Sequence, residues 1–201
     1  MLRHVPALEE KDDMPMAQIR KWTLRELHRL PDDGNKYELV RGELFVTPAP
    51  SREHEELAAR LARILDIYAA KHRLGLVYRP RAIIRIGESE VEPDLMVRPA
   101  SSGGPSGWEH APLPLLVVEI LSDTTRRRDQ GEKRTLYTDA GIPEYWIVDG
   151  EERRVRRVLP DARDQECDSS FTWHPAGAAE PLVIDLPRFF RQALEGEGGN
   201  A

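Results

Sequence analysis

The chain lacks several features that would place it in a specialised class of protein. It has 201 residues and a single cysteine, Cys167, which excludes an internal disulfide framework and a cysteine-rich zinc site. No apolar run approaches the length of a membrane-spanning helix. Residues 9–13 are all charged, so the N-terminal region lacks the apolar core of a signal peptide. We therefore expect a cytoplasmic protein with no membrane partner.

An excess of positive charge is also missing. The formal net charge of −6 argues against indiscriminate binding to nucleic acid. Two arginine-rich segments, residues 126–128 and 153–157, could still form a local basic patch, although such runs are more often solvated faces. The 40% hydrophobic and 32% charged residues otherwise indicate an ordinary globular protein.

Domain organisation follows from periodicity. We predict that residues 1–15, which have mixed charge and no periodicity, form a disordered leader. Residues 16–195 are predicted to form one domain, large enough to bury a core. The Gly-rich residues 196–201 are predicted to be a disordered tail.

Caps, turn residues and apolar spacing predict a mixed α/β (α+β) arrangement. Gly75 marks the end of the longest predicted helix. Residues 87–90 are predicted to be a turn, and residues 160–170 a polar loop. The predicted helices are residues 24–30, 52–72, 124–140 and 186–194, and the predicted strands are residues 36–40, 43–47, 76–86, 91–97, 113–121, 143–149, 153–159, 171–173 and 182–184.

The stretch at residues 113–121 is the centre of the predicted domain. It is apolar at nearly every position, which is typical of a strand covered on both faces. Glu119 lies inside it, and an ionised carboxylate there needs a cation or hydrogen bonds. The side chain either reaches solvent or an arginine at the end of the strand, or it is a metal-binding carboxylate at the edge of a sheet.

A partner for Glu119 is found in the preceding predicted strand. Asp94 lies in the middle of residues 91–97, so the two carboxylates converge if the strands are neighbours. Two close carboxylates repel each other, and a divalent cation between them makes this tolerable. All-oxygen ligation suits Mg²⁺ or Mn²⁺ better than zinc. The competing interpretation of Asp94 is a carboxylate in a turn at the end of a strand.

One lysine could complete such a site. Within the predicted helix 124–140, Asp129, Lys133 and Tyr137 share a face. A lysine beside a metal can activate the attacking water or offset charge in the transition state. Alternatively, Lys133 forms a structural ion pair with Asp129, and Tyr137 is a core residue.

The residues in this order resemble a known family. Pro93-Asp94 followed by Glu119 in an apolar strand is similar to the PD-(D/E)XK nuclease superfamily, and more closely to its Uma-two branch of restriction endonucleases. The resemblance covers residues 22–158. The matching segments are Tyr37-Glu-Leu-Val-Arg-Gly-Glu43, His54, Glu92-Pro-Asp-Leu95, Val118-Glu-Ile-Leu-Ser122, Arg128-Asp129, Lys133, Tyr137 and Gly141-Ile-Pro-Glu-Tyr-Trp146.

This resemblance implies a restriction-endonuclease-like fold, with a mixed central β-sheet flanked by helices. It also implies Mg²⁺-dependent (or Mn²⁺-dependent) chemistry on DNA. Asp94 and Glu119 would be metal ligands, with the backbone carbonyl of Ile120 as a third. Together with them, Glu38 and Lys133 would be catalytic.

The remaining matched residues have simpler interpretations as well. By the resemblance, His54 and Tyr137 border the site. His54 otherwise is a surface or capping-turn residue, and Glu38 a surface residue of its strand.

Two departures from the family pattern stand out. The lysine expected two residues after the glutamate is replaced by Leu121, and Lys133 on the following helix is the residue that fits its role. Asp123 stands where the family usually has proline, which loosens the turn.

The main hypothesis is a metal-dependent endonuclease that hydrolyses DNA phosphodiester bonds. The alternative is a nucleic-acid-binding or regulatory module that retains the nuclease fold with little turnover. A phosphohydrolase acting on a small or RNA substrate is a third hypothesis. A homodimer would place one active site on each of the two strands of a DNA duplex.

Overall fold

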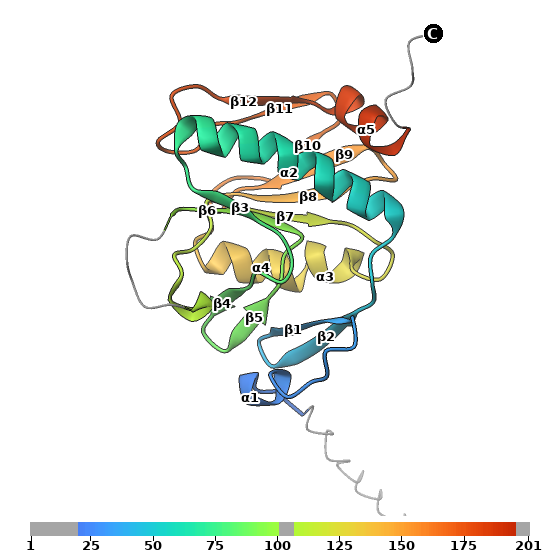
Figure 1. The fold of residues 1–201 in the computed structure, drawn as a ribbon, viewed down its shortest axis with the longest axis vertical. Coiled ribbons are helices and arrows are strands. Elements are labelled where there is room, and N and C mark those ends of the chain that lie inside the picture. Colours follow the sequence, from blue (N-terminus) through green and yellow to red (C-terminus); the bar gives the residue numbers. More distant parts are fainter. Residues whose placement is uncertain (1–19, 101–106, 196–201) are drawn as a thin grey trace, which may run out of the picture.

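The computed structural model describes residues 20–100 and 107–195 (Figure 1). The predicted leader and tail lie outside these residues, as do the first residues of the predicted domain. Within the described residues, the helices are α1 (Leu24–Leu27), α2 (Arg52–His72), the 3-10 helix η1 (Trp108–His110), α3 (Arg126–Gln130), α4 (Glu132–Asp139) and α5 (Leu186–Leu194).

A six-stranded sheet runs through the middle of the molecule (Figure 1). Its strand β7 pairs in parallel with β8 and antiparallel with β6, so the sheet is mixed. The apolar stretch at residues 113–121 therefore supplies an internal strand, as predicted. Across the sheet the order is β10 (Gln165–Cys167), β9 (Arg154–Val158), β8 (Tyr145–Asp149), β7 (Leu116–Ile120), β6 (Leu95–Arg98) and β3 (Leu76–Tyr78).

Helices cover both faces of this sheet, with α2 on one side and α3 and α4 on the other (Figure 1). Successive side chains of a strand point to opposite faces, so Leu116, Val118 and Ile120 pack in the core cluster that contains α2. Val117 packs in the cluster that contains α4. Glu119 therefore points toward α4, and it does so from a strand that is buried along its whole length.

Helix α2 begins where the sequence predicts. Ser51 caps it by accepting a hydrogen bond from the backbone N–H of His54. This cap places His54 in the first turn, at the end of the helix nearest to β1 (Lys36–Val40) and β2 (Glu43–Thr47) (Figure 1). The buried face of α2 includes the apolar residues Leu57, Leu61, Leu65 and Tyr68, which recur at helical spacing.

A smaller, four-stranded sheet lies beyond α3 and α4, away from the six-stranded sheet (Figure 1). The predicted strands 36–40 and 43–47 are present and form a hairpin, in which Arg41 and Gly42 of the turn have φ of 51° and 89°, as two-residue hairpin loops favour. The order is β2 (Glu43–Thr47), β1 (Lys36–Val40), β5 (Ser89–Val91) and β4 (Ile84–Ile86). A separate pair, β11 (Ser170–Trp173) and β12 (Leu182–Asp185), packs with α5.

Residues 76–86 do not form one continuous strand, and the break lies around Pro80, the residue that suggests an edge or a break in the sequence. The chain leaves β3 of the large sheet after Tyr78 and enters β4 of the small sheet at Ile84. Pro80 lies in this crossing, where it removes a backbone donor that a continuous strand would need. The predicted turn at residues 87–90 is also too long, because Ser89 and Glu90 belong to β5.

Two further boundaries differ from the prediction. The helix predicted over residues 124–140 is divided into α3 and α4 at Gly131, whose φ of −114° and ψ of −92° are not helical. The polar loop predicted over residues 160–170 contains the short strand β10, which pairs with β9. Polar edge strands of three residues carry too little apolar pattern to be predicted.

The described residues thus form the mixed α+β fold that the sequence predicts, with the central sheet flanked by helices. None of their helices has the length and apolar character needed to cross a membrane.

A substitution at Gly75 tests the junction of α2 and β3. Gly75 has φ of +132°, and a Cβ atom there would lie 2.0 Å from the carbonyl oxygen of Arg98. We expect Gly75→Ala to lower the free energy of unfolding by about 3 kcal/mol or more, as measured by urea denaturation.

Gly34→Ala is the matched control, because Gly34 also has a positive φ (+88°) but no atom within 4 Å of the added carbon. Its expected cost is about 1 kcal/mol. Equal losses in the two variants would contradict the steric explanation.

Candidate active site

Asp94 and Glu119 face each other across neighbouring strands. Leu95 of β6 pairs with Val118 of β7 in antiparallel register, so Asp94 continues the ladder opposite Glu119. The expectation that Asp94 lies in the middle of a strand is wrong, since it directly precedes β6. Pro93 interrupts the strand there, where the chain passes from the small sheet to the large one.

Three donors hold the Asp94 carboxylate. Oδ2 accepts hydrogen bonds from the backbone N–H of Ile120 at 2.8 Å and from His54 Nε2 at 3.0 Å. Oδ1 lies 3.2 Å from Lys36 Nζ. Burial alone would raise the pKa of Asp94, but Lys36 and His54 outweigh burial and hold it below its usual range. Asp94 is therefore an ionised carboxylate.

The His54 side chain belongs to this cluster and does not lie on the surface. Burial lowers the pKa of its imidazole, and the hydrogen bond to Asp94 more than reverses this effect, so that the net pKa is raised.

Glu119 meets α4 on the other side of β7. Lys133 Nζ lies 2.7 Å from Glu119 Oε1, and the Tyr137 hydroxyl donates to the same oxygen at 2.9 Å. Burial raises the pKa of Glu119 to about 8 despite Lys133, and the carboxylates of Asp129 and Asp94 add to the rise. Burial and the neighbouring carboxylates together therefore disfavour the ionised form of Glu119.

Glu38 approaches the same ammonium from the small sheet. Its Oε1 lies 2.6 Å from Lys133 Nζ and accepts the backbone N–H of Glu92 at 2.9 Å, and its Oε2 lies 3.3 Å from Arg128. Burial would raise the pKa of Glu38, but the cations Lys133, Lys36 and Arg128 lower it to about 2. Glu38 is therefore an ionised, fully buried carboxylate with two cationic partners.

Lys133 is the centre of this network. It is fully buried, with Glu38 and Glu119 at hydrogen-bond distance and Asp129 Oδ1 at 3.7 Å. Burial lowers the pKa of Lys133, but Glu119 and Glu38 more than compensate, so its pKa is raised and it stays an ammonium. The ion pair with Asp129 exists, but it is the longest of the three.

A cavity of about 540 Å³ opens beside these residues. Of the predicted site residues, Asp94, Glu119, Ile120 and His54 line it, together with Lys36, Glu92 and Asp129. Lys133, Glu38 and Tyr137 do not line it, because they lie behind Glu119. The structure therefore brings all the predicted residues into one network but divides them between the cavity wall and the layer behind it.

The residues on the cavity wall suit a hard divalent cation. Among the described residues, no three His, Cys, Asp or Glu side chains are grouped so that they could hold a metal. Mg²⁺, however, is often bound through one or two carboxylates with several waters. Asp94 and Glu119 provide two, and the described donors to Glu119 both bind Oε1, which leaves Oε2 for a cation. The pKa of Glu119 is raised mainly by burial and further by nearby carboxylates, and a cation at Oε2 would favour its ionised form.

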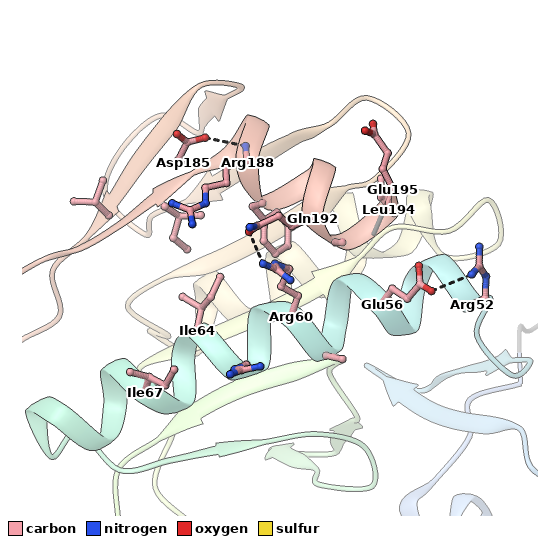
Figure 2. A pocket seen from close by; sticks show the side chains of 16 residues that line it. Arg52, Glu56, Arg60, Ile64, Ile67, Asp185, Arg188, Gln192, Leu194 and Glu195 are labelled. Carbon is pink, nitrogen blue, oxygen red and sulfur yellow. Dashed lines mark hydrogen bonds and ion pairs between the residues drawn. The ribbon is translucent and has the colours of Figure 1, made fainter. Parts of the chain in front are cut away.

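A larger groove, of about 970 Å³, lies elsewhere, between α2 and α5 (Figure 2). Two of its arginines have local partners, since Arg52 pairs with Glu56 and Arg60 bonds to Gln192. None of the predicted site residues lines it. The groove therefore offers volume without the clustered carboxylates that the chemistry needs.

Three residues of the network have no site role predicted from the sequence: Lys36, Glu92 and Arg128, the last two of which stand in the segments that resemble the family. Lys36 and Glu38 are two apart on β1 and so share a face, a signal that was present in the sequence. Arg128 lies in a run interpreted as a solvated face or basic patch, yet it is 6% exposed and bonds to Thr47 and Glu38. Its burial depends on the packing of α3 against the hairpin and has no local signal.

The second arginine-rich segment, residues 153–157, is largely neutralised. Its side chains are paired with acidic residues: Arg153 with Glu195, Arg154 and Arg156 with Glu166, and Arg157 with Glu144. A basic patch for nucleic acid therefore does not arise from this segment.

Comparisons with known proteins agree with the geometry. Residues 24–190 match the model of the Uma2 (Uma-two) family, described as "Putative restriction endonuclease". The chain also resembles the crystal structure of a "putative nuclease belonging to DUF820" from Anabaena variabilis ATCC 29413, with a TM-score of 0.73 and 19% sequence identity. That match covers 86% of this chain and 99% of the other. No curated protein matches the chain.

Removing the central ammonium should destabilise the fold strongly. In Lys133→Met, Glu38 and Glu119 lose the cation that they share, and we expect the free energy of unfolding to fall by about 3–5 kcal/mol in urea denaturation. The neighbouring Arg134→Met is the control, because Arg134 pairs with Asp164 at the surface and its loss should cost less than about 1 kcal/mol. Similar losses in both variants would contradict the central role of Lys133.

The lowered pKa of Glu38 predicts a pH dependence of stability. Its pKa falls from 4.5 to about 2 on folding, so the stabilisation is complete above pH 4.5 and is lost as the pH falls toward 2. Glu38→Gln removes this contribution. The difference in unfolding free energy between wild type and Glu38→Gln should be about 3 kcal/mol at pH 7 and about 2 kcal/mol smaller at pH 3, measured in urea. A difference that stays constant over this range would refute the assignment.

Proposed function

The chain belongs to the Uma2 family of restriction-endonuclease-like proteins, and from this premise we propose that it is a divalent-metal-dependent endonuclease that hydrolyses phosphodiester bonds in DNA. The observation that carries the proposal is the position of Asp94 opposite Glu119 on the wall of one cavity, with lysine and histidine partners around them.

In this proposal Asp94 and Glu119 hold Mg²⁺ or Mn²⁺, with the backbone carbonyl of Ile120 as a third ligand. The metal, when bound, supplies Lewis-acid activation of water and charge stabilisation at the phosphate. His54 and the backbone N–H of Ile120 orient Asp94 through its Oδ2. Such partners fix the direction in which a ligand presents its free oxygen.

Lys133 and Glu38 act from behind the cavity wall. From the sequence, Lys133 is expected to activate the attacking water, and that remains a prediction. The buried position of Lys133 supports a positioning role instead, in which its ammonium holds the Glu119 carboxylate in place. Glu38 in turn holds Lys133, and Tyr137 restricts the same oxygen of Glu119.

Two arginines in the lining of the cavity favour a substrate that contains phosphate. Arg79 and Arg81 line it from the segment between β3 and β4. Both side chains are exposed, and guanidinium groups are well suited to phosphate oxygens. An acidic protein can thus contact DNA locally without a strong general affinity for polyanions. We further propose that the protein is cytoplasmic. We also propose that it forms a homodimer, with one active site for each DNA strand.

Nicking of supercoiled plasmid DNA tests the activity. We expect wild type to nick the plasmid in the presence of Mg²⁺ or Mn²⁺ and not in the presence of EDTA. Asp94→Asn should reduce the rate by roughly 100-fold or more, because the ion loses a charged ligand. Asp66→Asn, which changes an exposed carboxylate on α2, is the matched control and should leave the rate unchanged.

The outcomes separate the hypotheses. Equal nicking by wild type and Asp94→Asn would show that the activity comes from a contaminant. A mobility shift without nicking would favour the binding module that retains the fold. Cleavage of RNA oligonucleotides with intact plasmid would instead favour the phosphohydrolase hypothesis.

A further inference from the structure

Lys36 lies in the cavity at the carboxylate that is proposed to bind the metal. It starts β1 and points to the same side of the strand as Glu38. Its Nζ is 3.2 Å from Asp94 Oδ1 and donates to the backbone carbonyl of Glu92 at 3.1 Å. The side chain is 15% exposed and lines the cavity, so the ammonium is at the boundary between the acidic cluster and the open space.

The two oxygens of Asp94 have different partners. Oδ2 is engaged by His54 and by the backbone of Ile120, both of which hold it from the protein side. In the described part of the chain, Oδ1 has Lys36 as its hydrogen-bond and ion-pair partner. Oδ1 is therefore the oxygen that a bound cation would take, and Lys36 already places a positive charge there.

The positive charge of Lys36 is stabilised by the whole cluster. Burial lowers the pKa of its ammonium, but Glu38, Asp94 and Glu119 reverse this effect and leave the pKa above its ordinary value. A buried carboxylate without a counter-charge is costly, so an ammonium at Oδ1 lets Asp94 stay ionised and ordered without a metal.

We infer that Lys36 is a resident counter-cation of Asp94 and that it competes with the divalent ion for Asp94 Oδ1. This inference rests on the proposed metal-dependent function and adds a residue that controls the affinity of the site. An ammonium hydrogen and a divalent ion cannot occupy the same position at one oxygen, so binding of the ion requires Lys36 to leave. The flexible four-carbon stem of lysine allows that movement into the cavity.

The competition predicts that the metal binds more tightly when Lys36 is removed. We expect Lys36→Met to bind Mn²⁺ at least about tenfold more tightly than wild type in calorimetric titration, because one close positive charge no longer opposes the ion. Without metal, the same variant should have a lower melting temperature than wild type, and Mn²⁺ should raise that temperature by more than it does in wild type.

Arg79→Met is the matched control for a general effect of charge. Arg79 also lines the cavity, but in the described part of the chain it makes no hydrogen bond or ion pair with Asp94. Its removal should change the Mn²⁺ affinity less than about threefold, because exposed charges are screened. Lys36→Arg, which keeps the charge, should stay close to wild type.

Each result decides between explanations. If wild type binds Mn²⁺ through Asp94, as judged by loss of binding in Asp94→Asn, and Lys36→Met gains no affinity, the counter-cation inference alone is wrong. An equal gain in Arg79→Met would also overturn it, since the gain would then come from net charge. If wild type does not bind Mn²⁺, or Asp94→Asn binds it equally well, the proposed metal site fails together with the inference.

Discussion

The ammonium of Lys133, enclosed between the carboxylates of Glu38 and Glu119, is the interaction on which the rest of the site depends. Glu119 comes from the large sheet, Glu38 from the small sheet and Lys133 from the helix layer between them. All three side chains have almost no exposure, and the Lys133 ammonium stabilises them by pairing with the ionised Glu38 and by donating to the Glu119 carboxyl group. The same contacts join three layers, so the chemistry of the site and the cohesion of the fold cannot be separated.

Much of the architecture can be predicted from local patterns. The two-residue turn at Arg41 and Gly42, the Ser51 cap and the doubly covered strand β7 each have a signal within a few residues. The failures at the predicted strands 76–86 and 91–97 share one cause, which is that the chain changes sheets. Between Tyr78 and Ile84, and again at Pro93, apolar residues continue through a crossing, and spacing alone does not tell which sheet they join.

The candidate site was predictable to a similar extent. Asp94 and Glu119 can be brought together from the order of the strands, and Lys133 from its helical face. Arg128 was missed because its burial depends on contacts across more than 50 residues of sequence, with Thr47 among the partners. The shared face of Lys36 and Glu38 could be read from the sequence, but the contact of Lys36 with Asp94 could not. Packing between layers decides which charged side chains are buried. A run of arginines has the same sequence whether its side chains are buried or exposed.

The passage Glu92-Pro93-Asp94 has a consequence for how a substrate would be held. Within three residues the chain leaves the small sheet and joins the large one, so the cavity straddles the seam between two separately hydrogen-bonded layers. A ligand bound in the cavity would therefore contact residues of both sheets. A rocking motion of one sheet against the other would widen or narrow the cavity. The width of the cavity would therefore depend on how firmly the two sheets are held together.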